Sequence, residues 1–296
     1  MKNFTFLIGA IAFALLLNSC QKESSPAPAA TSGTSPDLKT NSLNFTANAN
    51  CFGSGNAVKT IKNGLVGYYP FLGNANDESG NNNNGILRDF TDAGNNLIGL
   101  PTLTYDKYWH PNSAYKLNGI SNFIQVPNDP MSYGTTIDSS QPGQEHINKF
   151  SIYMRFKTNT PATLLQIGHF GLGSPSIALT IDSAKKVMAI WSFYVSGVGT
   201  LTGESVFATT GPTCAPTNSW TDLVVNYSNS NLSIYVNGRL AVTQPSTFSD
   251  GFIGGQMYIG AQDATFPQNY LKGSVDEVRV YDRSLTNNEI NYLLNH

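Results

Sequence analysis

The chain has 296 residues, of which 40% are apolar, so it is long enough to bury a full hydrophobic core. Only 12% of the residues are charged and the formal net charge is −2, which argues against nucleic-acid binding because that function needs a basic surface. Asn, Ser, Thr and Gly are abundant, together with 14 tyrosines. This composition suits an extracellular protein that meets neutral ligands.

The first twenty residues have the features of a secretion signal. Lys2 precedes an apolar run over residues 4–17, which is short for a membrane span. The run ends in Leu-Asn-Ser-Cys, which resembles a bacterial lipobox in which Cys20 is lipidated, although Asn18 replaces the usual small residue. Gln-Lys-Glu follows and resembles the export tag of surface lipoproteins in Bacteroidetes-type bacteria. We therefore expect a signal peptide over residues 1–20 and a lipid anchor to the outer membrane, with the protein at the cell surface.

Residues 21–50 are rich in Ser, Pro, Ala, Thr and Asn and cannot bury enough apolar surface to offset the cost of ordering the backbone. This composition predicts a disordered tether, followed by one domain over residues 51–296. Cys51 and Cys214 remain once Cys20 carries lipid. Two cysteines in an oxidising compartment suggest a disulfide, and the alternative is two unrelated free thiols.

The central part of the domain, residues 219–242, reads as three antiparallel strands. In the first of them, Leu223, Val225 and Tyr227 recur with a period of two, which places them on a buried face. The alternating residues, which we expect on an open face, are Asp222, Val224 and Asn226. Residues 228–231 form the first turn. Asn-Gly at 237–238 forms the second, because both central residues of a type I′ turn need a positive φ.

This stretch contains W-x-x-L-x-V-x-Y followed by L-x-I-Y-V-N-G-x-L, which resembles the core of the laminin G-like jelly-roll domains in the concanavalin A-like lectin and glucanase superfamily. Residues 71–85, 103–119 and 273–285 also resemble family motifs. The resemblance implies an all-β fold, an antiparallel two-sheet jelly-roll sandwich, with a short C-terminal helix. Thr286 and Glu289 predict a capping box at the start of that helix. The sequence departs from the family at Trp109, where Gly is usual, and at Arg155, where Trp is usual.

The loop at residues 73–85 crowds carboxylate, amide and carbonyl oxygens into a Gly-rich segment, which suits Ca²⁺ but does not match an EF-hand. An ordinary turn is the alternative, because Asn tolerates left-handed φ. The resemblance implies a structural calcium ion where the first and last strands of the jelly roll meet. The expected ligands are Asn74, Asp77, Asn81 and Asp276.

The sequence contains no recognisable catalytic constellation, such as the E-x-D-x-x-E of related glucanases, so we expect a protein that is not an enzyme. One acidic pair, Asp276 and Glu277, lies on a predicted strand, where alternation would point the two side chains to opposite faces.

A binding module needs only exposed aromatic rings, which pack on sugar faces, and polar groups that bind hydroxyls. The candidates are Tyr108, Trp109, Trp191 and Tyr194, and their alternative role is core packing. We therefore predict a lipid-anchored cell-envelope protein that binds a glycan or polysaccharide and meets the membrane only through its anchor. The alternatives are an adhesin or structural accessory module that binds surface proteins, and a divergent glycoside hydrolase.

Overall fold

The computed structural model describes residues 61–90, 99–128, 130–131, 136–137, 145–146, 149–168, 176–195, 202–210, 215, 218–245, 255–262 and 269–295. The signal peptide, the tether and all three cysteines lie outside these residues, so the lipid anchor, the disulfide and the domain limits stay predictions. Within the described residues, no helix combines the length and the apolar character needed to cross a membrane.

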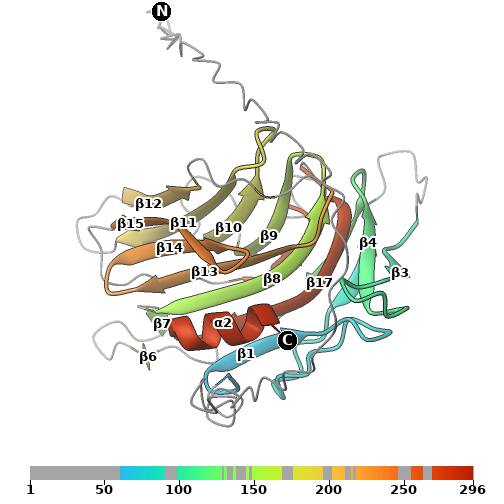
Figure 1. Ribbon diagram of the computed structural model, residues 1–296. Coiled ribbons are helices and arrows are strands. Elements are labelled where there is room, and N and C mark those ends of the chain that lie inside the picture. The colour runs from blue at the N-terminus through green and yellow to red at the C-terminus, as the bar shows by residue number, and fades with distance from the viewer. Residues whose placement is uncertain are drawn as a thin grey trace, which may run out of the picture. The chain divides into compact units, whose positions relative to one another are not determined.

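Two antiparallel sheets make up the described part of the domain (Figure 1). The first contains β1 (Leu65–Tyr69), β3 (Thr102–Thr104), β4 (Ala114–Asn118), β8 (Phe150–Thr158), β13 (Thr221–Ser228), β14 (Asn231–Val236), β15 (Arg239–Pro245) and β17 (Lys272–Tyr281). The second contains β2 (Ile86–Asp89), β5 (Asn122–Val126), β9 (Ala162–Gly168), β10 (Ser176–Ile181), β11 (Val187–Val195), β12 (Thr202–Thr209) and β16 (Met257–Ile259). Two short strands, β6 (Thr136–Ile137) and β7 (Glu145–His146), pair with each other.

The strand order is β15-β14-β13-β8-β17-β4-β3 in the eight-stranded sheet, in which β1 also pairs with β17. The order in the seven-stranded sheet is β12-β11-β10-β9-β16-β5-β2. The predicted all-β sandwich with a C-terminal helix is confirmed, and the helix is α2 (Asn287–Asn295).

The three predicted strands at the centre of the sequence are β13, β14 and β15. Both predicted turns are present, and the second has the predicted geometry, with φ of 47° at Asn237 and 81° at Gly238. The first turn has the same geometry, with φ of 50° at Asn229 and 59° at Ser230. Positive φ at both central residues gives each hairpin the twist of its strands. The Asn-Gly turn sets the register of β14 against β15 next to the turn, and the pairing shifts between Tyr235 and Ile234.

The main core lies between the sheets. Strand β8 contributes side chains both to this core and to a second apolar cluster on the other face of its sheet. Phe150, Ile152 and Met154 belong to the main apolar cluster, whereas Tyr153 belongs to a second cluster that includes Ile290 and Leu293 of α2. Helix α2 thus covers part of the outer face of the eight-stranded sheet, the face turned away from the seven-stranded sheet (Figure 1). The expectation that Val224 and Asp222 of β13 lie on an open face is wrong. Val224 packs in this second cluster and Asp222 is buried among charged partners.

A β-bulge interrupts β17. The pairing of β17 with β8 shifts register between Asp276 and Arg279, and Glu277 has a φ of 49°. One extra residue keeps Val275 and Val278 in the core, so Asp276 and Glu277 both fall on the outer face, where the same Arg155 nitrogen contacts both carboxylates. The expectation of opposite faces is therefore wrong, because it assumed unbroken alternation.

The capping box predicted for α2 is present. Thr286 Oγ1 accepts the backbone N–H of Glu289 at 3.3 Å, and the Glu289 carboxylate accepts the Thr286 N–H at 2.8 Å. Arg283 donates two further hydrogen bonds to Glu289, at 2.9 and 2.8 Å. Burial alone would raise the pKa of Glu289, but the bonds from Arg283 and Thr286 outweigh it and lower this pKa to about 2.

We expect Glu289→Gln to destabilise the protein by about 1–2 kcal/mol at pH 7, because it loses the charge-assisted bonds from Arg283. The Glu289 contribution is fully present above the unfolded-state pKa of 4.5 and is lost as pH falls towards 2. Urea unfolding at pH 7 and pH 3 measures both effects. An equal loss at both pH values would contradict the ionic role of Glu289.

Candidate functional site

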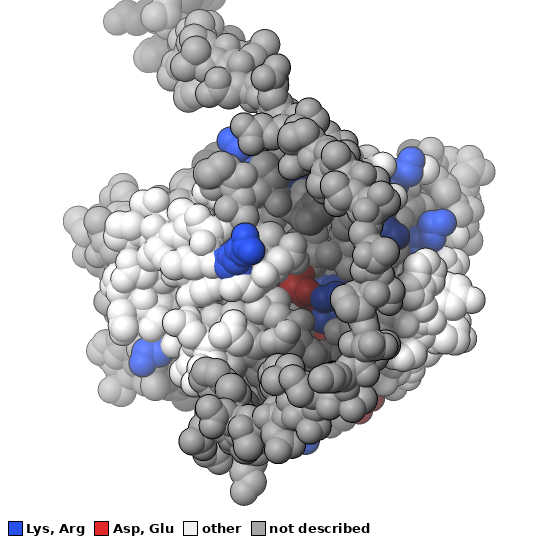
Figure 2. Space-filling view, viewed as in Figure 1, with Lys and Arg blue, Asp and Glu red and all other residues white. Residues whose placement is uncertain are grey.

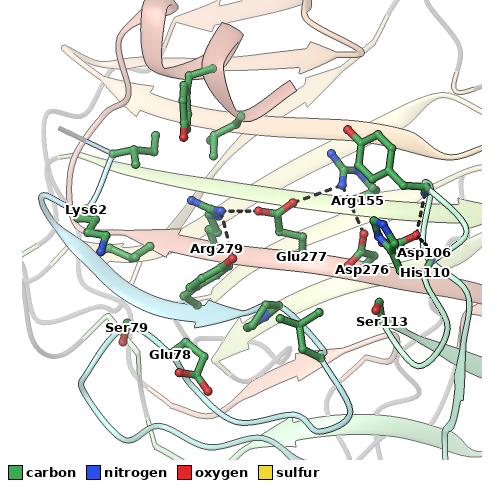
Figure 3. Close-up of a pocket in the computed structure, with 18 residues that line it drawn as sticks. Lys62, Glu78, Ser79, Asp106, His110, Ser113, Arg155, Asp276, Glu277 and Arg279 are labelled. Carbon is green, nitrogen blue, oxygen red and sulfur yellow. Dashed lines mark hydrogen bonds and ion pairs between the residues drawn. The ribbon is translucent and has the colours of Figure 1, made fainter. Parts of the chain in front are cut away.

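A cavity of about 540 Å³ opens on the outer face of the eight-stranded sheet (Figure 3). Strand β1 and the segment after it form one side, α2 forms another, and residues 106–113 close a third. Strands β8 and β17 provide the floor through Arg155, Asp276, Glu277 and Arg279. The first and last long strands meet here as expected, since Tyr69 of β1 pairs with Val278 of β17. We call this the outer-face cavity.

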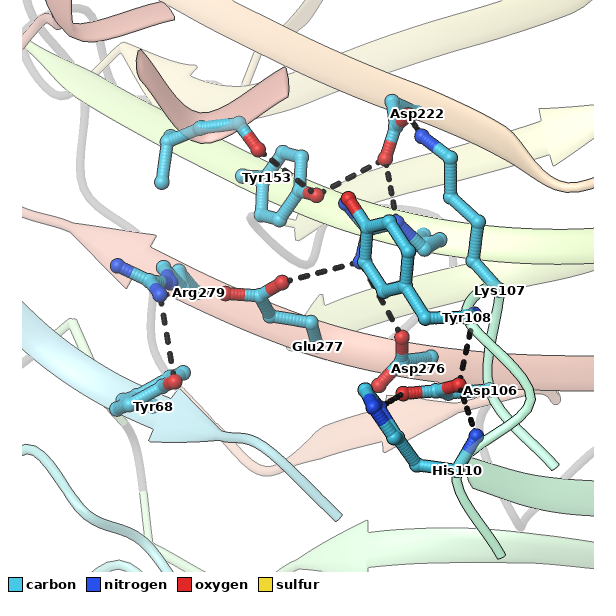
Figure 4. Close-up of polar contacts among 12 residues, drawn as sticks. Tyr68, Asp106, Lys107, Tyr108, His110, Tyr153, Asp222, Asp276, Glu277 and Arg279 are labelled. Carbon is cyan, nitrogen blue, oxygen red and sulfur yellow. Dashed lines mark hydrogen bonds and ion pairs between the residues drawn. The ribbon is translucent and has the colours of Figure 1, made fainter. Parts of the chain in front are cut away.

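Arg155, on the floor of the cavity, forms ion pairs with Asp222, Asp276 and Glu277, three of the carboxylates labelled in Figure 4. Its side chain is only 2% exposed, and Nε donates to Asp222 Oδ1 at 2.7 Å. Nη1 contacts Asp276 Oδ2 at 3.4 Å and Glu277 Oε2 at 3.3 Å. One guanidinium therefore faces three carboxylates. Lys107 adds a second positive charge, because Nζ lies 2.8 Å from Asp222 Oδ2.

Glu277 and Asp276 differ in how well their charges are balanced. Glu277 contacts both Arg155 and Arg279, and Arg279 also donates to the Tyr68 hydroxyl and lies over the Tyr68 ring at 4.2 Å. Among the described residues, the Asp276 carboxylate makes one ionic contact, the 3.4 Å contact with Arg155. Burial, with smaller contributions from the nearby Glu277 and Asp106 carboxylates, outweighs Arg155 and raises the pKa of Asp276 to about 7.

The loop at residues 105–110, which we call the aromatic loop, is built around Asp106. Its carboxylate accepts the backbone N–H groups of Tyr108 and His110 at 2.7 and 2.8 Å, and it bonds the His110 ring at 2.8 Å. This turn gives Trp109 a φ of 68°, a region that a bulky side chain rarely adopts. The usual Gly at this position is explained by that backbone conformation.

The structure gives the aromatic residues expected to bind a ligand different surroundings. Tyr108 lines the cavity, with its ring centroid 5.6 Å from the Arg155 guanidinium carbon, whereas Trp109 is 79% exposed and lies near Tyr105. Trp191 and Tyr194 fall in β11, but their side chains lie outside the described residues. Sequence reasoning missed Tyr105, Arg155 and Glu277 as parts of the site.

Charged side chains are sparse on this face. In Figure 2, which has the viewpoint of Figure 1, most described atoms are uncharged, and acidic and basic atoms meet in a hollow near the centre. The cavity lining contains four carboxylates, Glu78, Asp106, Asp276 and Glu277, against three permanent cations, Lys62, Arg155 and Arg279. One negative charge is in excess when all seven groups are ionised.

The expected calcium ligands are occupied by other contacts. Asp77 Oδ1 accepts the N–H groups of Tyr68 and Ser79, both at 2.9 Å, and Oδ2 accepts that of Asn83 at 3.0 Å. Asn74 accepts an N–H within the loop, and Asn81 donates to a β1 carbonyl oxygen.

Asp276 belongs to the Arg155 network, and in the described part of the chain no hydrogen bond or ion pair joins it to the other three expected ligands. Nor do the described residues include a cluster of three or more His, Cys, Asp and Glu side chains that could hold a metal. The four residues do not fit a calcium cage in this conformation. The buried carboxamide of Asn83 is the loop group that lacks described partners. Calcium binding stays a prediction.

Comparison with known proteins identifies the family. Residues 132–291 match the laminin G-type family model described as the concanavalin A-like lectin/glucanases superfamily. The match covers more than half of the chain, so the chain belongs to this superfamily. No curated protein sequence is significantly similar to it.

Several solved structures share the fold. Domain 4 of a GH43 extracellular arabinanase from Geobacillus stearothermophilus, in complex with arabinotriose, is 19% identical with a TM-score of 0.52, over 78% of this chain and 98% of that one. The binding domain of botulinum neurotoxin serotype D is 15% identical with a TM-score of 0.54, over 81% and 52% of the two chains. A neurotoxin DC binding domain in complex with SialylT is 14% identical with a TM-score of 0.51, over 79% and 52%. The chain thus spans about half of the neurotoxin domains. At these identities the similarity shows the fold alone.

The raised pKa of Asp276 predicts a pH-dependent stability. Because its folded-state pKa of about 7 exceeds the unfolded value of 3.8, the Asp276 contribution falls as pH rises from about 4 to about 7. We expect Asp276→Asn to be more stable than wild type at pH 8, by up to about 4 kcal/mol, and to differ less at pH 4.5. Urea unfolding at both pH values measures this difference, with Asp182→Asn, an exposed turn residue, as the control. A variant less stable than wild type at pH 8 would show that Arg155 depends on the charge of Asp276.

The loop geometry predicts that Asp77→Ala lowers the unfolding free energy by about 3 kcal/mol in calcium-free buffer, because three backbone N–H groups lose a charged acceptor. Glu78→Ala is the control, since Glu78 is exposed and its carboxylate accepts no such bond from the described residues. The same melting experiment tests calcium. A bound ion at a hundredfold excess over Kd adds about 2.7 kcal/mol, whereas an unchanged melting temperature after chelation and calcium addition would contradict the site.

Proposed function

We propose that this protein binds carbohydrate through the aromatic loop and the outer-face cavity. The observation that carries this proposal is Trp109, which is 79% exposed on a backbone with positive φ. Such a conformation costs about 1–3 kcal/mol for a bulky residue and tends to occur at ligand sites. With 79% of its surface exposed and Tyr105 as its neighbouring ring, the indole has little packing to offset this cost. A role in binding explains why Trp rather than Gly stands here.

The chemistry beside Trp109 suits a saccharide. Tyr105 and Trp109 have ring centroids 6.2 Å apart, so two exposed rings lie together next to a polar cavity. Sugar rings have apolar faces that pack on aromatic groups, while their hydroxyls bind to carboxylates and guanidinium groups. The arabinanase domain was solved with arabinotriose, which supports the same ligand class for a related fold.

Binding is favoured over hydrolysis by the state of the acidic pair. Glycoside hydrolysis needs two carboxyl groups that are free to act on either side of a bond. Glu277 instead contacts Arg155 and Arg279, one through each carboxylate oxygen. We therefore keep the glycosidase as the lesser alternative. The proposed setting is the cell envelope, with a lipid at Cys20 and residues 21–50 as the tether.

A glycan array with the full-length protein tests this function. We expect saccharide binding in wild type and a loss of at least tenfold in affinity for Trp109→Gly. Because Gly adopts a φ of 68° without strain, this variant should also melt at a higher temperature, by the equivalent of about 1 kcal/mol. Loss of binding with gain of stability separates a binding role from a structural one.

Phe90→Ala is the matched control, since Phe90 is an exposed aromatic side chain that does not line the cavity. The control should keep wild-type affinity. Binding to surface proteins with no saccharide bound would favour the adhesin, and release of reducing sugar would favour the glycosidase. Either result would overturn the proposal.

A further inference from the structure

The outer-face cavity contains a carboxylate whose charge is not balanced. Asp276 is 5% exposed, and its other oxygen, Oδ1, accepts no hydrogen bond among the described residues. The residue lines the cavity, on the same side as Asp106 and His110 (Figure 3). A buried carboxylate with an unused oxygen is costly unless a donor or a cation meets it.

Among the described residues of the lining, no donor or cation lies within hydrogen-bond distance of Asp276 Oδ1. Arg155 gives its short bond to Asp222 and only a 3.4 Å contact to Asp276. Arg279 contacts Glu277, and Lys107 contacts Asp222. Of the carboxylates in the lining, Asp276 is the most deeply buried, and its one cation contact among the described residues is the 3.4 Å contact with Arg155.

A single small cation would complete this arrangement. The described residues offer no group of three metal-ligating side chains, so the geometry favours an organic cation over a metal ion. An ammonium group is compact and has three donors, which suits a site with one unused carboxylate oxygen beside a second carboxylate, Asp106. Tyr108 and Tyr68 provide rings at the edge of the same cavity.

We propose that the outer-face cavity binds the primary ammonium group of an amine-bearing saccharide, with Asp276 as its counter-ion. This inference rests on the proposed carbohydrate binding and specifies the class of sugar. Trp109 packs against the sugar ring, and Asp276 distinguishes a free amine from an acetamido or hydroxyl group. The cavity size is within the range of pockets that bury a small ligand.

Isothermal titration calorimetry with the full-length protein at pH 7.5 tests the proposal. The probes are a glucosamine trisaccharide with free amines, its N-acetylated counterpart and a glucose trisaccharide of the same linkage. We expect the free-amine sugar to bind at least tenfold more tightly than the other two. Asp276→Asn should remove this preference, so that the free-amine sugar binds no more tightly than the other two trisaccharides. Asp182→Asn, which makes the same change in net charge, should keep the preference.

A pH series provides an independent readout. The described ionisable and charged groups that line the cavity with Asp276 come from every element around it: Asp106, Tyr108 and His110 from the loop, Arg155 from β8, Glu277 and Arg279 from β17, Tyr68 from β1, Lys62 and Glu78 from the segments before and after β1, and Tyr292 from α2. Affinity for the free-amine sugar should rise between pH 5.5 and pH 7.5, as Asp276 ionises. His110→Gln should keep this rise and Asp276→Asn should lose it. The opposite pattern would assign the rise to His110 and overturn the role of Asp276.

The outcomes separate this inference from the proposed function. Equal affinity for all three trisaccharides would overturn the amine preference and leave carbohydrate binding intact. Binding of a lysine peptide without any saccharide would overturn both. Wild-type affinity of Asp276→Asn for the free-amine sugar would also overturn the proposed counter-ion, and its melting curve shows whether the variant is folded.

Discussion

The buried guanidinium of Arg155 is the constraint on which the outer face depends. It lies on β8 at the middle of the eight-stranded sheet and meets carboxylates from β13 on one side and from β17 on the other. Removing such a cation would leave several buried negative charges close together, which costs far more than the loss of its hydrogen bonds. Lys107 extends the same network to the aromatic loop. The position of the loop and the charge of the cavity thus have one common origin.

Local sequence patterns predict much of the sheet architecture. The site depends on residues that do not follow those patterns. The alternation in β13 and the Asn-Gly turn at 237–238 are properties of neighbouring residues, so the hairpins could be predicted. The three carboxylate partners of Arg155 are 67, 121 and 122 residues away in the sequence, and no local pattern pairs them with Arg155. The bulge at Glu277 did leave a signal, because the valines at 275, 278 and 280 change their spacing from three residues to two. If all three valines are assumed to face the core, this change in spacing predicts the bulge.

The two departures from the family pattern both occur at the site. Arg155 replaces a Trp, and its charge requires the carboxylates that surround it. Trp109 replaces a Gly in a turn whose φ of 68° suits Gly. Each residue carries an energetic cost at its position, because the charge of Arg155 is buried and the backbone of Trp109 has a positive φ. Local inconsistency of this kind concentrates at functional positions, because elsewhere it would only reduce stability.

The cavity wall joins parts of the chain that are far apart in sequence and are therefore synthesised at different times. Tyr68 and Glu78 come from the first described strand and the loop after it, whereas Arg279 and Tyr292 come from β17 and α2. Strand β17 lies between β8 and β4 and also pairs with β1, so neither the sheet nor the cavity is complete until residues 272–281 are inserted. Strand pairing across such a large sequence separation forms slowly, so the earlier strands remain without their β17 partner until late in folding. A partly synthesised or clipped chain that lacks this strand would have no cavity, so ligand capture is a property of the complete sheet.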